Sequence, residues 1–164
     1  MTEKLKVQCC IAGGGPAGMM LGYLLGRAGI RAVVLEKHAD FLRDFRGDTV
    51  HPSTLQIMQE LGLLPDFLLQ PHSRISAIAA EIEDRTFEIA DLRRVPTPYR
   101  FIALMPQWDF LNFLRQKARG FPSLQVRMSA EVTSLVEVDG RIAGARARTA
   151  AGPRKCAARA AEVA

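Results

Sequence analysis

The chain has 164 residues, of which 48% are hydrophobic and 24% charged, and its formal net charge at pH 7 is +5. This size and composition are those of one globular domain with a sizeable core, and they exclude collagen-like and disordered chains. Nucleic-acid binding is also not expected, because the basic residues are dispersed and the aromatic residues lie mainly in apolar segments.

The first forty residues predict a strand, a glycine-rich turn, a buried helix and a second strand. Residues 6–12 form an apolar run that is typical of a buried parallel strand and is too short for a signal peptide or a membrane span. Residues 16–28 have the length and apolar content of a helix, with Pro16 in its first turn. Residues 33–35 form the second strand, which ends on Glu36. We therefore expect a βαβ unit in a cytoplasmic protein.

The middle of the chain predicts a loop, a helix and a change of sheet. A loop over 37–52 precedes a helix from about 54 to 61, for which Ser53 and Gln56 have the spacing of a capping box. Residues 75–92 alternate between apolar and polar, as an antiparallel hairpin with one wet face would.

The last third predicts a return to the first sheet. A helix is expected from Pro106 to Gly120. Asp139-Gly140 is a strong hairpin signal between the last two of three strands that would form an antiparallel crossover. The tail from Ala150 has no clear apolar period, so we expect it to be irregular. The crossover strands are expected over residues 124–128, 131–138 and 141–149.

The strongest functional signal is a G-x-G-x-x-G pattern between the first predicted strand and helix, formed by Gly13, Gly15 and Gly18. Gly13 would allow a tight turn, Gly15 would let the backbone approach a pyrophosphate, and Gly18 would let helix and strand pack closely. The helix amino terminus, which contains Pro16 and Ala17, would present unpaired N–H groups and a partial positive charge to the phosphates.

An acid follows at the distance that a dinucleotide fingerprint requires. Glu36, with Lys37 beside it, lies about 20 residues after the glycine set, at the end of the second strand. Its carboxylate would accept hydrogen bonds from ribose hydroxyls of an adenosine. The alternative is a glycine turn of a βαβ unit that binds nothing.

The other chemically active side chains give weaker signals. Cys9 and Cys10 are adjacent in a strand, where successive side chains point to opposite faces, so the three cysteines are interpreted as reduced core residues. No metal site is predicted, because the three histidines lack the spacing of metal ligands.

Two further segments are distinctive, FRGDTVHPSTLQIMQELGL and MPQWDFLNFL. Together with CIAGGGPAGMMLGYLLGRAGIRAVVLEK, they make residues 4–149 resemble the amino-terminal third of the para-hydroxybenzoate hydroxylase-like, or group A, FAD-dependent monooxygenases. The resemblance implies that Arg46 reaches back to the FAD and that Gln107 hydrogen-bonds its ribityl or phosphate portion. The alternatives are a surface arginine on a loop and a glutamine that caps a helix.

The resemblance also implies a reaction. The intact relative would take hydride from NAD(P)H onto FAD and use the reduced flavin with oxygen to hydroxylate an aromatic or other small organic substrate. No side chain of this chain is predicted to be a catalytic acid or base. A flavin dehydrogenase, reductase or halogenase with the same FAD domain is one alternative. A non-catalytic nucleotide-binding remnant is another.

We therefore expect an α/β fold, with a Rossmann-type FAD-binding βαβ sheet, antiparallel crossover strands and the start of a substrate-binding sheet. Residues 1–70 would hold the FAD-binding βαβ unit with the arginine loop and the following helix. Residues 71–105 would hold strands of the substrate-binding sheet. Residues 106–164 would return to the FAD-binding domain with a helix, a three-stranded crossover and an irregular tail. Family members continue to Asp-Gly and Gly-Asp motifs that contact FAD and do not occur here as such sites, so we expect a truncated chain that is inactive alone.

Overall fold

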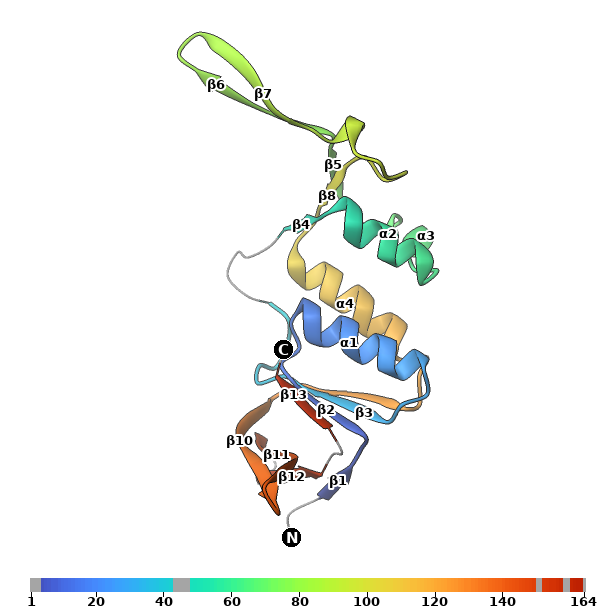
Figure 1. Ribbon diagram of the computed structural model, residues 1–164, viewed down its shortest axis with the longest axis vertical. Coiled ribbons are helices and arrows are strands. Elements are labelled where there is room, and N and C mark those ends of the chain that lie inside the picture. Colours follow the sequence, from blue (N-terminus) through green and yellow to red (C-terminus); the bar gives the residue numbers. More distant parts are fainter. Residues whose placement is uncertain (1–3, 43–47, 150–151, 158–159, 164) are drawn as a thin grey trace. The chain divides into compact units, whose positions relative to one another are not determined.

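A computed structural model describes residues 4–42, 48–149, 152–157 and 160–163 (Figure 1). The chain divides into two compact units, one formed by Met1–Leu42 with Phe110–Ala164 and the other by Arg43–Asp109. Within the described residues, no helix is both long and apolar enough to cross a membrane.

The first unit is built on a parallel sheet with the strand order β13-β2-β3-β9. The residues of β3 are all buried, which explains its uninterrupted apolar sequence. Helix α1 connects β2 to β3 and packs on one face of the sheet (Figure 1). The elements are β2 (Cys9–Ala12), α1 (Pro16–Arg27), β3 (Ala32–Leu35), β9 (Leu124–Arg127) and β13 (Ala160–Val163).

Helix α1 has the start and the end that its sequence predicts. Pro16 occupies its first position after the N-cap Gly15, where the missing N–H of proline costs nothing. Beyond the C-cap Ala28, Gly29 has a φ of 73°, the left-handed conformation in which helices commonly end.

The second sheet of this unit has the order β1-β12-β11-β10 and covers the other face of the parallel sheet (Figure 1). Asp139 and Gly140 have φ values of 52° and 71° and join β10 to β11, which confirms the predicted hairpin. Buried side chains of both sheets form one core cluster. The strands are β1 (Lys4–Lys6), β10 (Ala130–Val138), β11 (Arg141–Thr149) and β12 (Gly152–Ala157).

Three expectations for this unit are wrong. The single strand predicted over 6–12 is two strands in different sheets, β1 and β2. The first predicted crossover strand, β9, belongs to the parallel sheet, and β10, β11 and β12 form the antiparallel crossover instead. The described parts of the tail, residues 152–157 and 160–163, are not irregular, because β12 pairs with β11 and β13 with β2. The tail sequence has no apolar period, but the edges of β11 and β2 supply the backbone hydrogen bonds that form these strands.

The second unit contains a small antiparallel sheet of order β4-β8-β5, a separate hairpin of β6 and β7, the helices α2 and α3, the short 3₁₀ helix η1 and the start of α4. Helix α4 begins at Gln107, as predicted from Pro106, and continues into the first unit. The elements are β4 (Thr49–Val50), α2 (Pro52–Glu60), α3 (Leu64–Phe67), β5 (Ser73–Ile75), β6 (Ala77–Ile82), β7 (Arg85–Asp91), η1 (Leu92–Arg94), β8 (Ile102–Leu104) and α4 (Gln107–Ala118).

Two details of this unit differ from the sequence prediction. Helix α2 begins at Pro52 after the N-cap His51 with no side-chain cap, so Ser53 lies inside the helix and forms no capping box. The β6–β7 hairpin is present, but it does not have one buried and one wet face. Its large apolar side chains are 41% to 65% exposed, namely Ile78, Ile82, Phe87 and Ile89.

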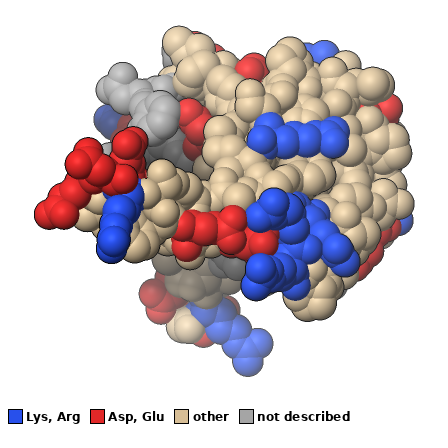
Figure 2. Space-filling model, turned by 90° about the horizontal axis from the view of Figure 1, so that it is seen from above, with Lys and Arg blue, Asp and Glu red and all other residues tan. Residues whose placement is uncertain are grey.

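Charged side chains around the hairpin are paired with one another. Arg93 contacts Glu88 at 3.1 Å and Asp91 at 2.7 Å, and Arg94 contacts Asp91 at 3.2 Å. Figure 2 likewise shows Lys and Arg side chains beside Asp and Glu side chains on the face that it presents. Exposed pairs of this kind contribute little to stability, about 0–1 kcal/mol each.

Candidate functional site

The turn after β2 is held against the end of β3. Gly13 has a φ of 114°, a conformation that glycine adopts readily and other residues rarely, and its N–H donates to the carbonyl of Leu35 at 2.9 Å. Gly15 follows as the N-cap of α1, and a Cβ placed on it would meet nothing within 4 Å. The turn therefore leaves open space at Gly15, where a ligand can approach the backbone.

Gly14 is a close-approach position that the glycine pattern does not identify. Its N–H donates to Oε2 of Glu36 at 2.8 Å. A Cβ on Gly14 would lie 2.9 Å from the Cβ of Glu36, which is closer than real Cβ atoms pack. The glycine turn and the predicted ribose-binding acid are thus in direct contact.

Glu36 is buried and held by several donors. Its Oε1 accepts hydrogen bonds from the backbone N–H of His38 at 3.0 Å and lies 2.6 Å from Nδ1 of the His38 ring. Burial by itself raises the pKa of Glu36, but the hydrogen bonds from His38 and Gly14 lower that pKa below its ordinary value overall. An ionised carboxylate therefore stands at the carboxyl end of β3 at neutral pH.

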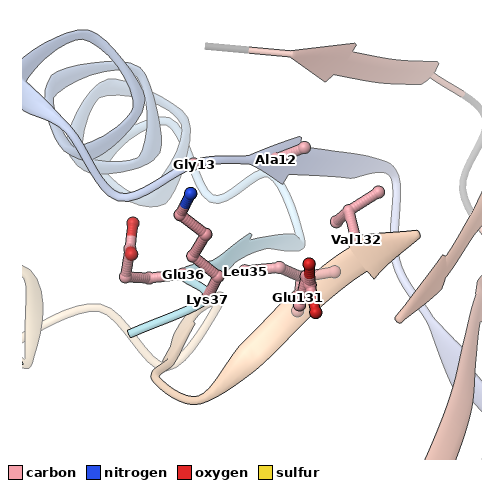
Figure 3. A pocket seen from close by; sticks show the side chains of 7 residues that line it. All are labelled: Ala12, Gly13, Leu35, Glu36, Lys37, Glu131 and Val132. Atoms are coloured by element: carbon pink, nitrogen blue, oxygen red, sulfur yellow. The ribbon is translucent and has the colours of Figure 1, made fainter. Parts of the chain in front are cut away.

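A cavity of about 300 Å³ opens beside this carboxylate. It lies beyond the carboxyl ends of β2 and β3, where open α/β sheets bind their ligands. Figure 3 shows Glu36 on one side, Glu131 and Val132 of β10 on the other, and Lys37 between them. Its lining residues are Ala12, Gly13, Leu35, Glu36, Lys37, Glu131 and Val132.

Glu131 is a second acid at this cavity, and sequence reasoning did not identify it. Nη2 of Arg148 on β11 lies 2.6 Å from Oε2 of Glu131. The hydrogen bond and charge of Arg148 lower the pKa of Glu131, and the charge of Lys37 adds to this effect. Nothing in the sequence marks Glu131 among the other acids. It reaches the cavity because the N–H of Ala130 donates to the carbonyl of Glu36 at 2.8 Å, and the pairing of β10 with β11 places Arg148 beside it.

The remaining predicted site residues lie in three places. Pro16 and Ala17 are exposed at the start of α1, whereas Gly18 is buried in the helix. Gln107 is half-buried and is the first residue of α4, in the unit of residues 43–109. Arg46 lies outside the described residues.

This arrangement suits the adenosine and pyrophosphate end of a dinucleotide. The unpaired N–H groups at the start of α1 can bind an anion, and the space at Gly15 admits one. The ionised Glu36 can accept hydrogen bonds from hydroxyl groups. Among residues 4–42, 48–149, 152–157 and 160–163, no group of three or more His, Cys, Asp or Glu side chains could hold a metal ion.

Comparisons with known proteins point to the same ligand. The family model described as FAD binding domain matches residues 6–159. The 6-methylpretetramide 4-monooxygenase of Streptomyces rimosus is 30% identical over 135 residues, which are 82% of this chain and 32% of that protein. The dialkyldecalin synthase of Streptomyces rugosporus is 31% identical over 125 residues, which are 76% of this chain and 26% of that protein. The chain therefore spans a third or less of these curated relatives.

A solved structure agrees with the fold. The p-nitrophenol 4-monooxygenase of Pseudomonas putida DLL-E4 matches with a TM-score of 0.83 at 23% sequence identity. The match covers 99% of this chain and 41% of that structure. The predicted α/β fold is confirmed.

Proposed function

The chain belongs to the FAD binding domain family, and we propose that it binds FAD in the cavity at Glu36 as part of a flavin-dependent monooxygenase. The resemblance to FAD-dependent monooxygenases that the sequence predicted is confirmed by the family match and by a monooxygenase relative. The observation that carries the proposed site is the hydrogen bond from Gly14 to Glu36, which sets an ionised carboxylate beside the open space at Gly15.

Each group of the cavity has a proposed task. The backbone at Gly15 and the start of α1 hold the pyrophosphate, and Glu36 binds ribose hydroxyls. Lys37 and Val132 line the part of the cavity that the adenine would fill. Arg46 and Gln107 stay predicted contacts to the rest of the cofactor. The bound FAD would supply the electron transfer and oxygen chemistry, while these residues bind and orient it.

The finer proposal is that NAD(P)H is the co-substrate and that a small aromatic compound is hydroxylated. It rests on the resemblance to the para-hydroxybenzoate hydroxylase-like enzymes. A second candidate has support of its own, because one relative bears the name of a synthase and not of a monooxygenase. An FAD-binding fold does not by itself fix the reaction.

Substitution of Gly15 tests the FAD site. Gly15 has ordinary extended backbone angles, so Gly15→Ala should fold as the wild type does. Its methyl group would occupy the space proposed for the pyrophosphate, and we expect the affinity for FAD to fall at least about tenfold, which is 1.4 kcal/mol. Quenching of flavin fluorescence measures the affinity, and urea unfolding measures the stability.

Gly120→Ala is the matched control, because its added Cβ would make only an ordinary contact at 3.5 Å with the Lys117 carbonyl. This variant should bind FAD as the wild type does. Wild-type affinity in Gly15→Ala would place the pyrophosphate elsewhere. Absence of FAD binding by the wild type would reject the proposal itself.

The reaction is tested separately. Oxidation of NADH or NADPH is followed by the loss of the absorbance of the reduced nicotinamide, with and without phenols and aromatic acids. Consumption that an aromatic compound stimulates, with a hydroxylated product, supports the monooxygenase. Binding of FAD without stimulated consumption would favour a reaction of another type, such as that of a synthase.

A further inference from the structure

The corner where two strand pairs change sheet brings two cysteines together. Strands β1 and β12 pair in parallel in the crossover sheet, and the strands that follow them, β2 and β13, pair in parallel in the other sheet. Strands β1 and β2 are consecutive in the chain and lie in different sheets, and the same is true of β12 and β13 (Figure 1). Cys156 is on β12 and Cys10 is on β2, one on each side of this corner.

The two thiols are in contact inside the core. Cys10 and Cys156 are 1% and 3% exposed and belong to the same buried cluster between the sheets. The thiol of Cys10 donates a hydrogen bond to the sulfur of Cys156. Cys9 is also buried, but as the neighbour of Cys10 on one strand its side chain points to the opposite face of the sheet.

The surroundings shift the pKa values of the two thiols in opposite directions. The hydrogen bond from Cys10 lowers the pKa of Cys156, burial opposes this, and the positive charge of Arg127 supports it. The same hydrogen bond and burial raise the pKa of Cys10. Cys156 also lines a cavity of about 20 Å³ with Arg127 and Thr149. A cavity of this size admits a water-sized molecule, since about 10–15 Å³ suffices.

We propose that Cys10 and Cys156 form a redox-active dithiol, which a small peroxide oxidises to a reversible disulfide between the two sheets. The thiolate of Cys156 attacks one oxygen of hydrogen peroxide, forming an S–O bond as the O–O bond breaks, and the departing hydroxide takes up a proton as water. Cys10 then loses its proton and attacks the sulfur of Cys156. The S–S bond forms as the S–O bond breaks and a second water leaves. The two thiols lose two electrons, and the peroxide gains them.

The disulfide would attach β2 to the crossover sheet just before the glycine turn. Strand β2 (Cys9–Ala12) contains Cys10 and is followed directly by Gly13. The cross-link would therefore fix the strand that carries the turn. This proposal does not depend on FAD binding, because both cysteines lie in the core and outside the cavity at Glu36.

Peptide mapping tests the proposal. The reduced full chain is treated with a small excess of hydrogen peroxide, its remaining thiols are alkylated after denaturation, and it is digested. Before alkylation, we expect an intact chain about 2 Da lighter, the mass of two hydrogens. After digestion, we expect a cross-linked peptide pair that dithiothreitol separates. Because Cys9 and Cys10 share one peptide, the Cys9→Ala variant identifies the partner.

Three single Cys→Ala variants show which cysteines form the cross-link. Cys9→Ala should still form the cross-link, whereas Cys10→Ala and Cys156→Ala should lose it. The decisive comparison needs no substitution at the pair itself: in Cys9→Ala, the cross-link should form at least about tenfold faster in native protein than in urea, because the fold holds the thiols together. Equal rates in both states, two free thiols after peroxide treatment, or a cross-link only between two chains would each overturn the proposal.

Discussion

Glu36 is a buried acid whose charge is stabilised mainly by N–H donors, and this makes stability depend on pH. Hydrogen bonds from His38 and Gly14 hold its pKa below the ordinary value of 4.5. A group whose pKa is lowered by folding stabilises the protein fully above its unfolded pKa. That contribution is lost as the pH falls through the folded-state pKa. The glycine turn should therefore loosen in acid.

Glu36→Gln tests this dependence. At pH 7 we expect the variant to lose about 1–3 kcal/mol of the free energy of unfolding, the usual effect of removing hydrogen bonds to a charged group. The difference from the wild type should shrink as the pH falls below 4.5, where Glu36 of the unfolded chain takes up a proton, and it should be lost below the lower pKa of the folded state. Urea unfolding at pH 7 and at lower pH values measures it. Glu137→Gln, at an exposed position of β10, is the control. A difference independent of pH would contradict the explanation.

At the residue scale, spacing in the sequence identified part of the cavity. Gly13 and Glu36 follow from the dinucleotide pattern, and the structure brings them to one cavity. Gly14 occupies a variable position of that pattern, so its contact with Glu36 could not be predicted. Glu131 reaches the cavity because the N–H of its neighbour Ala130 donates a hydrogen bond to the carbonyl of Glu36, far away in the sequence, at 2.8 Å. Gln107 stays a predicted FAD contact.

At the scale of elements, close packing of α1 on the parallel sheet depends on Gly22. A Cβ on Gly22 would lie 2.8 Å from Cγ2 of Val34 on β3. We expect Gly22→Ala to destabilise the protein by about 1–3 kcal/mol, the usual cost of overpacking. This cost exceeds the gain in helix propensity from glycine to alanine of about 1 kcal/mol. Urea unfolding gives the difference.

The double variant Gly22→Ala with Val34→Ala is the control for Gly22. Removing the valine methyl groups makes room for the new Cβ. The double variant should therefore lose less stability than the sum of the two single variants. Additive losses would show that Val34 does not crowd the new Cβ. A Gly22→Ala protein as stable as the wild type would show that the helix and the strand can move apart without cost.

Elements with a strong local signal were predicted, and those set by pairing were not. Helix α1 and strand β3 have continuous apolar sequences, and the turn at Asp139-Gly140 has its own backbone chemistry. The break between β1 and β2 has no such signal, because the sheet that each joins is decided by distant partners. The sequence did not predict strand β13 for the same reason, because this strand forms by pairing with β2, which is distant in the sequence.

At the scale of the whole molecule, the β6–β7 hairpin exposes an apolar surface that should promote self-association. Ile82 and Phe87 are 60% and 46% exposed. Exposed apolar side chains that lie together favour association. We expect the wild type to form dimers or larger species as its concentration rises and Ile82→Thr with Phe87→Thr to remain monomeric, as measured by sedimentation velocity. Glu81→Gln, a polar position of the same hairpin, should behave as the wild type. A wild type that is monomeric throughout would contradict this expectation.

The affinity for FAD should come mainly from the groups that bind the adenosine and pyrophosphate end of the cofactor. The Glu36 carboxylate at the cavity and the open backbone at Gly15 suit the adenosine and pyrophosphate end of the cofactor. If they supply most of the affinity, ADP should compete with FAD with a dissociation constant within about tenfold, or 1.4 kcal/mol. Riboflavin, which lacks this end, should not compete. Gly15→Ala should weaken ADP and FAD by the same factor.

Competition between ADP and FAD, measured by flavin fluorescence, shows which end of FAD supplies most of the affinity. The predicted contacts of Arg46 and Gln107 would act on FAD beyond the adenosine half. If these two side chains dominate, FAD should bind more than about a hundredfold more tightly than ADP, a difference of 2.7 kcal/mol. Substituting Gln107 by Ala would then weaken FAD and leave ADP unchanged. If ADP and FAD instead bind with near-equal affinity, and Gln107→Ala binds FAD as the wild type does, most of the affinity comes from the glycine turn and Glu36. These are the residues that the dinucleotide pattern of the sequence predicted.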